Sequence, residues 1–334
     1  MPFNIWRTIA FIMGWLVLIT IFHQQLNVES GDRKTVYIGY MPVVTNLAAP
    51  LIDYATVEGE GIRFKSLKFS SFAEMAEALR HNEIQAGFMI APLSIVLRQQ
   101  AEDIKVVYIG NRHESTLVTR KDLKVKSLAD LKGKTLAVPM RYSGHNLSIL
   151  HLLEEKGLQG DVKIVEMNPP DMASALISGS LDAYYVGEPF AAQTLRSGDA
   201  SLLYYVEDVW PGFICNVMVV KQSLIDEDRG VVQQLVSAAV RSGKWADENI
   251  DDAIKVAAQY WNQSEDLIRY VFTQPKNRIV FDQYTPKQDE MLFMADLMLK
   301  YDLVESDDIE GLVDDSFAKA VSLENIEGIH SILK

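Results

Sequence analysis

TLAVPMRYSGHN (residues 135–146) opens the segment that decides the fold, and DAYYVGEPF (182–190) closes it. Thr135–Val138 is typical of a short buried strand, and the residues after it predict a helix that begins at Ser143 and ends before Gly157. A second strand and a second helix then lead to a third strand, 183–186. In parallel α/β units, ligands bind in the loops that follow the carboxyl ends of the strands. We therefore expect the pocket to be built from the two loops that follow these strands.

Half of this α/β unit occurs twice in the chain. Residues 74–93 align without a gap with residues 171–190, at a constant offset of 97 positions, and both copies read as helix, turn, strand and proline-bearing loop. The shared residues are Met75/Met172, Ala76/Ala173, Ala78/Ala175, Leu79/Leu176, Ala86/Ala183 and Pro92/Pro189. Ser71 with Glu74 is expected to cap the first helix, and Asp171 the second. The repeat predicts two α/β lobes of one design rather than a solenoid, which needs three or more units.

Length and composition exclude several classes of function. The 334 residues suffice for two lobes, and the net charge of -13 argues against nucleic-acid binding, which needs Lys and Arg for phosphates. Cys215 is the only cysteine, so neither an internal disulfide nor a cysteine-based metal centre is expected, and we interpret it as a small core residue. The sequence holds no phosphate-binding loop, dinucleotide fingerprint or nucleophile elbow. We predict no catalytic residue, metal or cofactor.

The first 34 residues are expected to form a signal or membrane anchor and a linker. An apolar run from Ile9 to Phe22 follows Arg7, a length that suits a signal peptide. No small-x-small cleavage site follows it, which favours retention as an anchor in the cytoplasmic membrane through residues 5–22. Arg7 favours leaving the amino end in the cytoplasm, so the rest would lie in the periplasm or outside the cell. Residues 24–34 are interpreted as the linker.

The remaining chain divides into segments that exchange between the lobes. Residues 35–119 are assigned to lobe one and 120–216 to lobe two, with 116–119 carrying the chain across. The apolar run 214–220 is expected to return to lobe one, followed by helices over 230–249, 250–261, 265–273, 287–301 and 311–321. These helices should pack around lobe one (217–321), and residues 322–334 should form a tail.

In lobe one, the candidate contacts follow the first and third strands. The loop 41–46 follows a strand at 36–40, and Thr45 and Asn46 can cap the next helix or bind a ligand together with free backbone N–H groups. Ala91 and Pro92 occupy the corresponding loop after the strand 84–90. Simple capping remains the alternative for both polar residues.

In lobe two, the candidate contacts are the first turn of the helix that begins at Ser143 and the loop at Glu188. Ser143, Gly144, His145 and Asn146 place unpaired backbone N–H groups beside an imidazole and an amide. His145 is either a ligand contact or a solvated helix-start residue. Glu188 could bind a ligand, hold a cation or accept hydrogen bonds from its own loop, and we favour the last because a buried carboxylate needs partners.

Taken in order, LKGKTLAV (131–138), SGHNL (143–147) and DAYYVGEPF (182–190) resemble the solute-binding proteins of nitrate, sulfonate, taurine and bicarbonate ABC transporters. IGY (38–40), TNLAAP (45–50) and MIAPL (89–93) resemble the nitrate and bicarbonate branch most. The resemblance covers about residues 35–321. It implies a type II periplasmic binding fold, in which two α/β lobes joined by two crossing strands close on a ligand.

The resemblance also implies positions for the cleft. It places Thr45, Asn46, Ala91, Pro92, Ser143, Gly144, His145 and Glu188 there. Phe213 stands where nitrate binders of this type have a lysine, which favours an uncharged, organic or larger ligand, and Arg141 could supply a replacement charge. The full set of candidate ligand contacts is Met41, Thr45, Asn46, Ala91, Pro92, Arg141, Ser143, Gly144, His145, Asn146, Glu188 and Phe213.

Three functions remain open at this point. The first is a monomeric, membrane-tethered solute-binding protein that delivers a small molecule to an ABC permease. The second is a ligand-binding sensor module without a transporter. The third is an enzyme on the same scaffold, similar to relatives that make a thiamine pyrimidine or dehydrate a menaquinone precursor. The cysteine-rich motif of the thiamine enzyme is absent here.

Overall fold

The computed structural model describes residues 5–27 and 33–334, which belong to two separate units divided after Lys34. The first unit holds a helix, α1 (Ile5–Asn27), whose apolar side chains from Trp6 to Phe22 are exposed. Within the described residues, we find no helix with both the length and the apolar character needed to cross a membrane. The expected linker lies partly outside the described residues.

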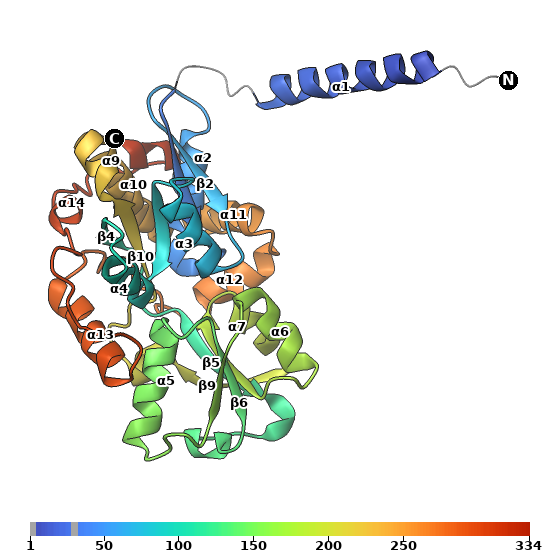
Figure 1. The fold of residues 1–334 in the computed structure, drawn as a ribbon. Helices are drawn as coiled ribbons and strands as arrows, with labels where there is room; N and C mark the ends of the chain where they lie inside the picture. Colours follow the sequence, from blue (N-terminus) through green and yellow to red (C-terminus); the bar gives the residue numbers. More distant parts are fainter. Residues whose placement is uncertain (1–4, 28–32) are drawn as a thin grey trace. The chain divides into compact units, whose positions relative to one another are not determined.

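The second unit begins with a five-stranded sheet of order β2-β1-β3-β10-β4 (Figure 1). Its strands are β1 (Thr35–Tyr40), β2 (Arg63–Lys68), β3 (Ala86–Ile90), β4 (Ile104–Ile109) and β10 (Asn216–Lys221). The connecting helices are η1 (Val44–Asn46), α2 (Ala48–Thr56), α3 (Phe72–Arg80) and α4 (Ala91–Gln99). β1 runs parallel to β2 and β3, whereas β10 lies antiparallel between β3 and β4. This sheet is the centre of lobe one.

Lobe two is built on a second sheet of order β7-β6-β8-β5-β9. Its strands are β5 (Ser115–Arg120), β6 (Thr135–Val138), β7 (Lys163–Glu166), β8 (Ala183–Gly187) and β9 (Ala200–Tyr205). The helical segments are η2 (Lys121–Leu123), η3 (Leu128–Leu131), α5 (Gly144–Glu155), α6 (Pro169–Ile177), α7 (Phe190–Ser197) and α8 (Val206–Val209). β6 is parallel to β7 and β8, and β5 is antiparallel to β8 and β9. The two sheets therefore have the same topology, and the expected α/β class with two lobes is confirmed.

The internal repeat is confirmed at the level of single residues. α6 begins and ends 97 residues after α3, and β8 begins and ends 97 residues after β3. The predicted caps are wrong, because Ser71 makes no capping hydrogen bond through its side chain and α6 begins after Asn168, with Asp171 inside its first turn. Beyond the strands the copies differ, since α4 starts at once at Ala91 and α7 starts only at Phe190.

The chain crosses between the lobes after β4 and again before β10, and the two crossing segments pair with each other. Arg112 and Ile214 form an isolated antiparallel bridge between them. Lobe one is then completed by α9 (Gln222–Glu227), α10 (Arg229–Glu248), α11 (Ile250–Trp261) and α12 (Glu265–Thr273). The predicted bounds of the last two helices are confirmed. The apolar run 214–220 returns the chain to lobe one through β10, as expected. The crossing expected over 116–119 and the lobe boundary at 119 are wrong, because β5 already lies in the sheet of lobe two.

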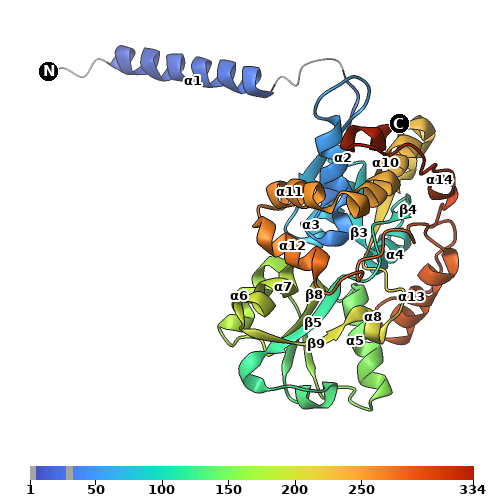
Figure 2. The ribbon, with the colours of Figure 1, turned by 180° about the vertical axis from the view of Figure 1, so that it is seen from behind.

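The chain then returns to the crossing segments and to lobe two, which the sequence analysis did not predict. Val280 bridges to Arg112, and α13 (Gln288–Lys300) contacts both α4 of lobe one and α5 of lobe two (Figure 2). The Arg112 guanidinium is buried, donates to the Gly212 carbonyl oxygen at 2.6 Å and forms an ion pair with Glu290 at 2.8 Å. The expectation that these helices surround lobe one alone is therefore wrong for α13.

The carboxyl-terminal residues are ordered against lobe one. Of the helix expected over 311–321, only α14 (Ser316–Lys319) forms, and the segment 322–334 ends in η4 (Ile329–Leu333). Arg241 of α10 donates hydrogen bonds to the carbonyl oxygens of Ser322 (2.7 Å) and Ser331 (2.9 Å). The buried Ile332 side chain adds an apolar contact.

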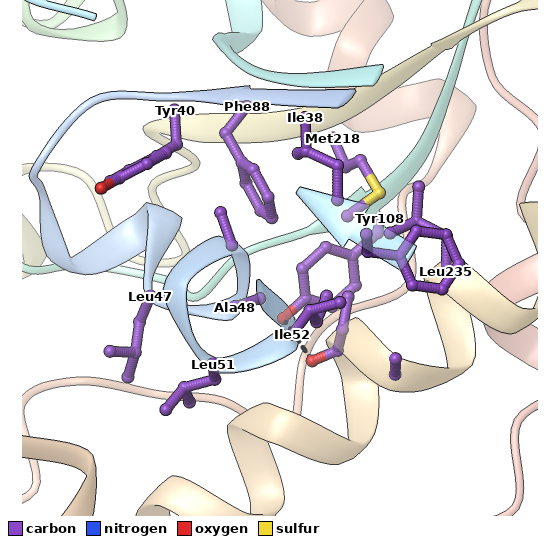
Figure 3. Close-up of a cluster of buried hydrophobic side chains, with 14 of the residues drawn as sticks. Ile38, Tyr40, Leu47, Ala48, Leu51, Ile52, Phe88, Tyr108, Met218 and Leu235 are labelled. Atoms are coloured by element: carbon purple, nitrogen blue, oxygen red, sulfur yellow. Dashed lines mark hydrogen bonds between the residues drawn. The ribbon is translucent and has the colours of Figure 1, made fainter. Parts of the chain in front are cut away.

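The core of lobe one lies between its sheet and the helices α2 and α10. Figure 3 shows side chains from β1, β3, β4 and β10 gathered with those of α2 and with Leu235 of α10. Phe88 and Tyr108 meet edge to face with ring centroids 6.3 Å apart, and the Tyr108 hydroxyl donates to the carbonyl oxygen of Ala239. A second buried cluster includes Met41 and Ala91 of lobe one together with Leu147 and Phe190 of lobe two, so apolar packing is continuous across the junction.

Candidate ligand-binding site

The lobe-one side of the junction is formed by η1 and the first turn of α4. Thr45 and Asn46 lie inside η1 and do not cap α2, whose N-cap is Leu47 and has no side-chain capping bond. Asn46 instead accepts a hydrogen bond from the Asn216 amide (2.7 Å) and donates one to the Met41 carbonyl oxygen (3.1 Å). Its amide therefore holds the loop after β1 against β10.

The backbone of the two lobes is in direct contact here. The N–H of Val44 donates to the carbonyl oxygen of Glu188 across the junction at 3.0 Å. The N–H of Ala91 donates to the carbonyl oxygen of Cys215 at 2.9 Å, which extends the pairing of β3 with β10 into the crossing segment. Gly110 is required beside this contact, because an added Cβ would lie 1.8 Å from the Thr45 carbonyl oxygen. The first bond links η1, in the loop after β1, to the loop after β8.

On the lobe-two side, the start of α5 is buried, so His145 is not the solvated helix-start residue that the sequence analysis gave as one alternative. Ser143 is the N-cap and accepts from the Asn146 N–H at 3.1 Å, while the Asn146 amide donates to the Arg141 carbonyl oxygen at 2.8 Å. Gly144 is needed because an added Cβ would lie 2.8 Å from the Phe213 ring. Ser143 and Asn146 thus shape the loop after β6 and present His145.

His145 is held by aromatic rings and a single side-chain hydrogen bond. Its ring meets those of Tyr185 (centroids 5.1 Å apart) and Phe213 (5.7 Å) edge to face, and its Nε2 lies 2.9 Å from Ser115 Oγ. Burial lowers the pKa of His145 to about 3, so its imidazole is neutral at neutral pH. No hydrogen-bond partner of Nδ1 occurs among the described residues.

Two buried carboxyl groups are linked to this histidine through Ser115, Glu114 directly and Glu188 through Glu114. Glu114 precedes β5 with φ near +70°, a conformation that costs a non-glycine residue about 1–3 kcal/mol. Its carboxyl accepts from Ser115 Oγ at 3.2 Å and from the Glu188 N–H at 2.6 Å. Burial raises its pKa to about 8, so Glu114 is largely protonated at neutral pH.

Glu188 has its full set of partners inside the protein. Its carboxylate accepts from the Thr116 hydroxyl (2.7 Å) and from the Ala192 N–H (2.8 Å), and the Arg278 guanidinium lies 3.5 Å away. Burial raises the pKa of Glu188, which Arg278 opposes. A backbone N–H is thus one of its partners, but it belongs to the first turn of α7 and not to the loop that the sequence analysis favoured.

Arg141 lies apart from these buried groups. Its side chain is 61% exposed and forms an ion pair with Glu166 at 2.9 Å, which raises the arginine pKa. Close to it, a crevice of about 240 Å³ separates the start of α3 (Ser71 to Ala73) from Met140 and Asn168 of lobe two. The crevice thus lies between the equivalent ends of the two repeat copies.

Several residues at the junction were missed from the sequence. Glu114, Ser115 and Tyr185 surround His145, and Arg278 donates hydrogen bonds to Glu207 (2.8 Å) and to the Ser115 carbonyl oxygen. A carboxylate directly before the crossing strand was a usable signal for Glu114. No sequence pattern around Arg278 indicates that it lies at the junction, which it reaches from the segment between α12 and α13.

Cys215 lies at the centre of the junction as a buried thiol, the small core residue that the sequence analysis expected. Burial raises its pKa, and its neighbours include Glu114, Ser115 and Thr45. Among the described residues, no three His, Cys, Asp or Glu side chains are grouped so that they could hold a metal ion. Around His145 the arrangement offers hydroxyl groups and an imidazole as hydrogen-bonding groups, and Arg278 at the junction is paired with Glu188 and Glu207.

Comparison with known proteins shows which family the sequence matches. Residues 29–261 match a model of the NMT1-like family. A protein of Bacillus subtilis (strain 168), whose name provisionally assigns it the binding of aliphatic sulfonates, is 25% identical over 90% of this chain and 93% of its own length. The taurine-binding periplasmic protein of Escherichia coli (strain K12) is 30% identical over 52% of this chain and 54% of its own.

Solved structures agree on the fold. The alkanesulfonate-binding protein SsuA of Xanthomonas axonopodis pv. citri superposes with a TM-score of 0.72 at 19% identity, covering 85% of this chain and 99% of its own. The periplasmic nitrate-binding protein NrtA of Synechocystis PCC 6803 superposes with a TM-score of 0.75 at 14% identity, covering 86% and 88%. The predicted periplasmic binding fold is confirmed.

Proposed function

Because the chain belongs to the NMT1-like family, we propose that it is an extracytoplasmic solute-binding protein that captures a small molecule between its lobes for an ABC importer. The observation that carries this proposal is the junction itself. Two sheets of one topology are joined by crossing segments that pair at Arg112 and Ile214, and loops of both lobes meet there. Rotation about those segments would open and close the cleft, and a ligand that contacts both lobes would favour the closed form.

The ligand proposed is a small anion or a small organic compound. Relatives are named for aliphatic sulfonates, taurine and nitrate, which share compact size and several acceptor oxygens. Helix starts offer backbone N–H groups to such oxygens. We assign contact to the first turns of α4 and α5, with His145 as the central side chain and Phe213 as an apolar wall.

We place the protein outside the cytoplasm, beside an ABC permease, with residues 5–22 as a signal or a tether to the cytoplasmic membrane. The apolar run after Arg7 supports this placement. Fractionation of cells that produce the full chain tests the tether. Release of the full-length chain into the soluble extracytoplasmic fraction would contradict it.

Calorimetry on the full chain tests the binding function. Titration with taurine, methanesulfonate, nitrate and bicarbonate should give saturable binding of at least one, and small-angle scattering should show a smaller radius of gyration when that solute is bound. Absence of both binding and compaction for all four would contradict the proposal in this form.

A histidine variant tests the site. His145→Gln should weaken the binding found by at least about tenfold, which corresponds to about 1.4 kcal/mol. The control is His330→Gln, because His330 lies in η4 on lobe one, where its ring contacts the Ala55 carbonyl oxygen. Equal affinities of the two variants would refute the site but not the function.

A further inference from the structure

Glu114, Ser115 and His145 form a continuous chain of hydrogen bonds at the junction. Ser115 Oγ lies 2.9 Å from His145 Nε2 and 3.2 Å from Glu114 Oε1, and all three side chains are buried. The second Glu114 oxygen, Oε2, accepts from the Glu188 N–H, which fixes it as an acceptor. Oε1 and the serine hydroxyl are therefore free to exchange donor and acceptor roles.

We propose that these three residues form a relay that decides whether His145 Nδ1 donates or accepts a hydrogen bond, and that the donating form binds an acceptor oxygen of the ligand. The inference rests on the proposed function, because it assumes that a small solute binds at the junction. Glu114 and Ser115 act as positioning residues, since they reach the ligand only through His145. The ligand class is a molecule with an accessible oxygen acceptor, as in a sulfonate, a nitrate or a carbonyl compound.

The relay has two arrangements that differ by one proton. In the first, Glu114 is protonated and donates to Ser115 Oγ, the serine donates to His145 Nε2, and the imidazole carries its proton on Nδ1. In the second, the Nδ1 proton has left to solvent, the serine proton has moved to Nε2, and the Glu114 proton has moved to the serine. Glu114 is then ionised and accepts from Ser115, while Nδ1 has become an acceptor.

The surroundings of Glu114 favour the first arrangement at neutral pH. The charged and titratable groups that face Glu114 are Glu188, Arg278 and Cys215, and burial with Glu188 outweighs Arg278, so its pKa is about 8. Because the His145 imidazole is neutral, it carries one proton, and a protonated Glu114 places that proton on Nδ1. The donor form should therefore give way to the acceptor form near pH 8.

The place for the ligand oxygen is marked by His145 Nδ1, a buried polar atom that has no hydrogen-bond partner among the residues that the structure describes. The buried hydroxyls of Ser148 and Tyr185 lie close to it and interact with each other. Ser148 lies one turn after His145 on α5, and the rings of Tyr185 and His145 are in contact. A buried donor without a partner destabilises the folded protein, so an acceptor oxygen at this place would be stabilised by His145 Nδ1 when that nitrogen carries the proton.

Nitrogen NMR of the histidine rings tests the relay without any ligand. In the full chain labelled with 15N-histidine, the ring signals missing from a His145→Gln variant identify His145. They should report a proton on Nδ1 at about pH 6.5 and on Nε2 at about pH 9.5, with a midpoint near 8. Glu114→Gln should hold the Nδ1 proton throughout, because its amide always donates to Ser115, and Ser115→Ala should abolish the midpoint. A tautomer that does not change across this range would overturn the relay.

Affinity against pH tests the contact with the ligand. Titration with methanesulfonate and with nitrate should show binding to the native chain weaker by at least about tenfold at pH 9 than at pH 7, and binding to Glu114→Gln nearly constant. Glu155→Gln, at the exposed end of α5, is the control and should behave like the native chain. A tautomer change without any change in affinity would overturn the ligand contact. Failure of both solutes to bind would count against the proposed function, while the NMR result would still decide the relay.

Discussion

Replacement of Glu114 by glutamine should change the way in which stability depends on pH. Glu114 is fully buried, and its pKa is about 8 in the folded protein, mainly because burial disfavours the charged form. In the unfolded chain, the same carboxyl releases its proton near its ordinary pKa of 4.5. Between these values the folded state binds more protons than the unfolded state, so the free energy of unfolding falls as the pH rises. Because glutamine cannot ionise, the variant lacks this fall in the free energy of unfolding.

The expected size follows from the two pKa values. Each pH unit between 4.5 and about 8 changes the free energy of unfolding by about 1.4 kcal/mol, so the whole window amounts to on the order of 5 kcal/mol. Below pH 4.5 and above pH 8 the difference between the two proteins should be constant. The titration of His145 occurs in both proteins and does not enter the difference.

Urea unfolding measured at steps from about pH 5 to about pH 9 provides the assay, with Glu155→Gln as the control. The free energy of unfolding of Glu114→Gln, relative to the native chain, should rise steadily up to pH 8 and then level off. The control should show no such trend. A constant difference between pH 5 and pH 8 would mean that Glu114 is already ionised in the folded protein, and the proton relay would then lose its basis.

Three further changes test the packing of the junction and of the carboxyl terminus. Arg278→Met should lower the free energy of unfolding by about 3–5 kcal/mol, because it leaves the buried carboxylate of Glu188 and the partly buried one of Glu207 without their cation. A loss below about 1 kcal/mol in urea unfolding would contradict this. Gly110→Ala should lower the free energy of unfolding by about 3 kcal/mol, since its Cβ would lie 1.8 Å from a backbone oxygen. The control Gly87→Ala would place no atom closer than 3.4 Å to its Cβ. Thermal unfolding should therefore give a lower midpoint temperature for Gly110→Ala than for Gly87→Ala. Arg241→Met should lower the hydrogen-exchange protection of residues 322–334, because it removes the hydrogen bonds to Ser322 and Ser331. Lys244→Met, on the exposed side of the same helix, should leave that protection unchanged. Equal protection in the two variants would refute the anchoring role of Arg241.

Much of the fold could be predicted because its signals are local. Hydrophobic periodicity and helix-stop residues gave α11 and α12 their bounds, and the offset of 97 residues located α3 with α6 and β3 with β8. Caps were less predictable, because whether a side chain bonds a nearby N–H depends on a rotamer and not only on residue type. Ser71 shows this, since it is the N-cap of α3 and its side chain makes no capping bond, whereas Asp171 makes none because α6 already begins at Pro169.

The candidate site was predictable only as a set of loops. Motif order placed Thr45, His145 and Glu188 in strand-end loops, and the structure buries all three at the junction. In the structure, the side chains of Asn46 and Asn146 form hydrogen bonds that hold their loops in place. Arg141 is exposed and paired with Glu166. No pattern within a window of the sequence distinguishes a polar residue that shapes a loop from one that faces the cleft.

By itself, the sequence determined that the chain forms two α/β lobes of one design that exchange segments, since periodicity, repeat and motif order are properties of neighbouring residues. Only the tertiary structure decided that α13 spans both lobes, that Arg278 meets Glu188, and that a carboxyl at position 114 touches a histidine 31 residues later through Ser115. The physical reason is that a hydrogen bond between distant residues, and the burial that shifts their pKa values, exist only once the chain has packed.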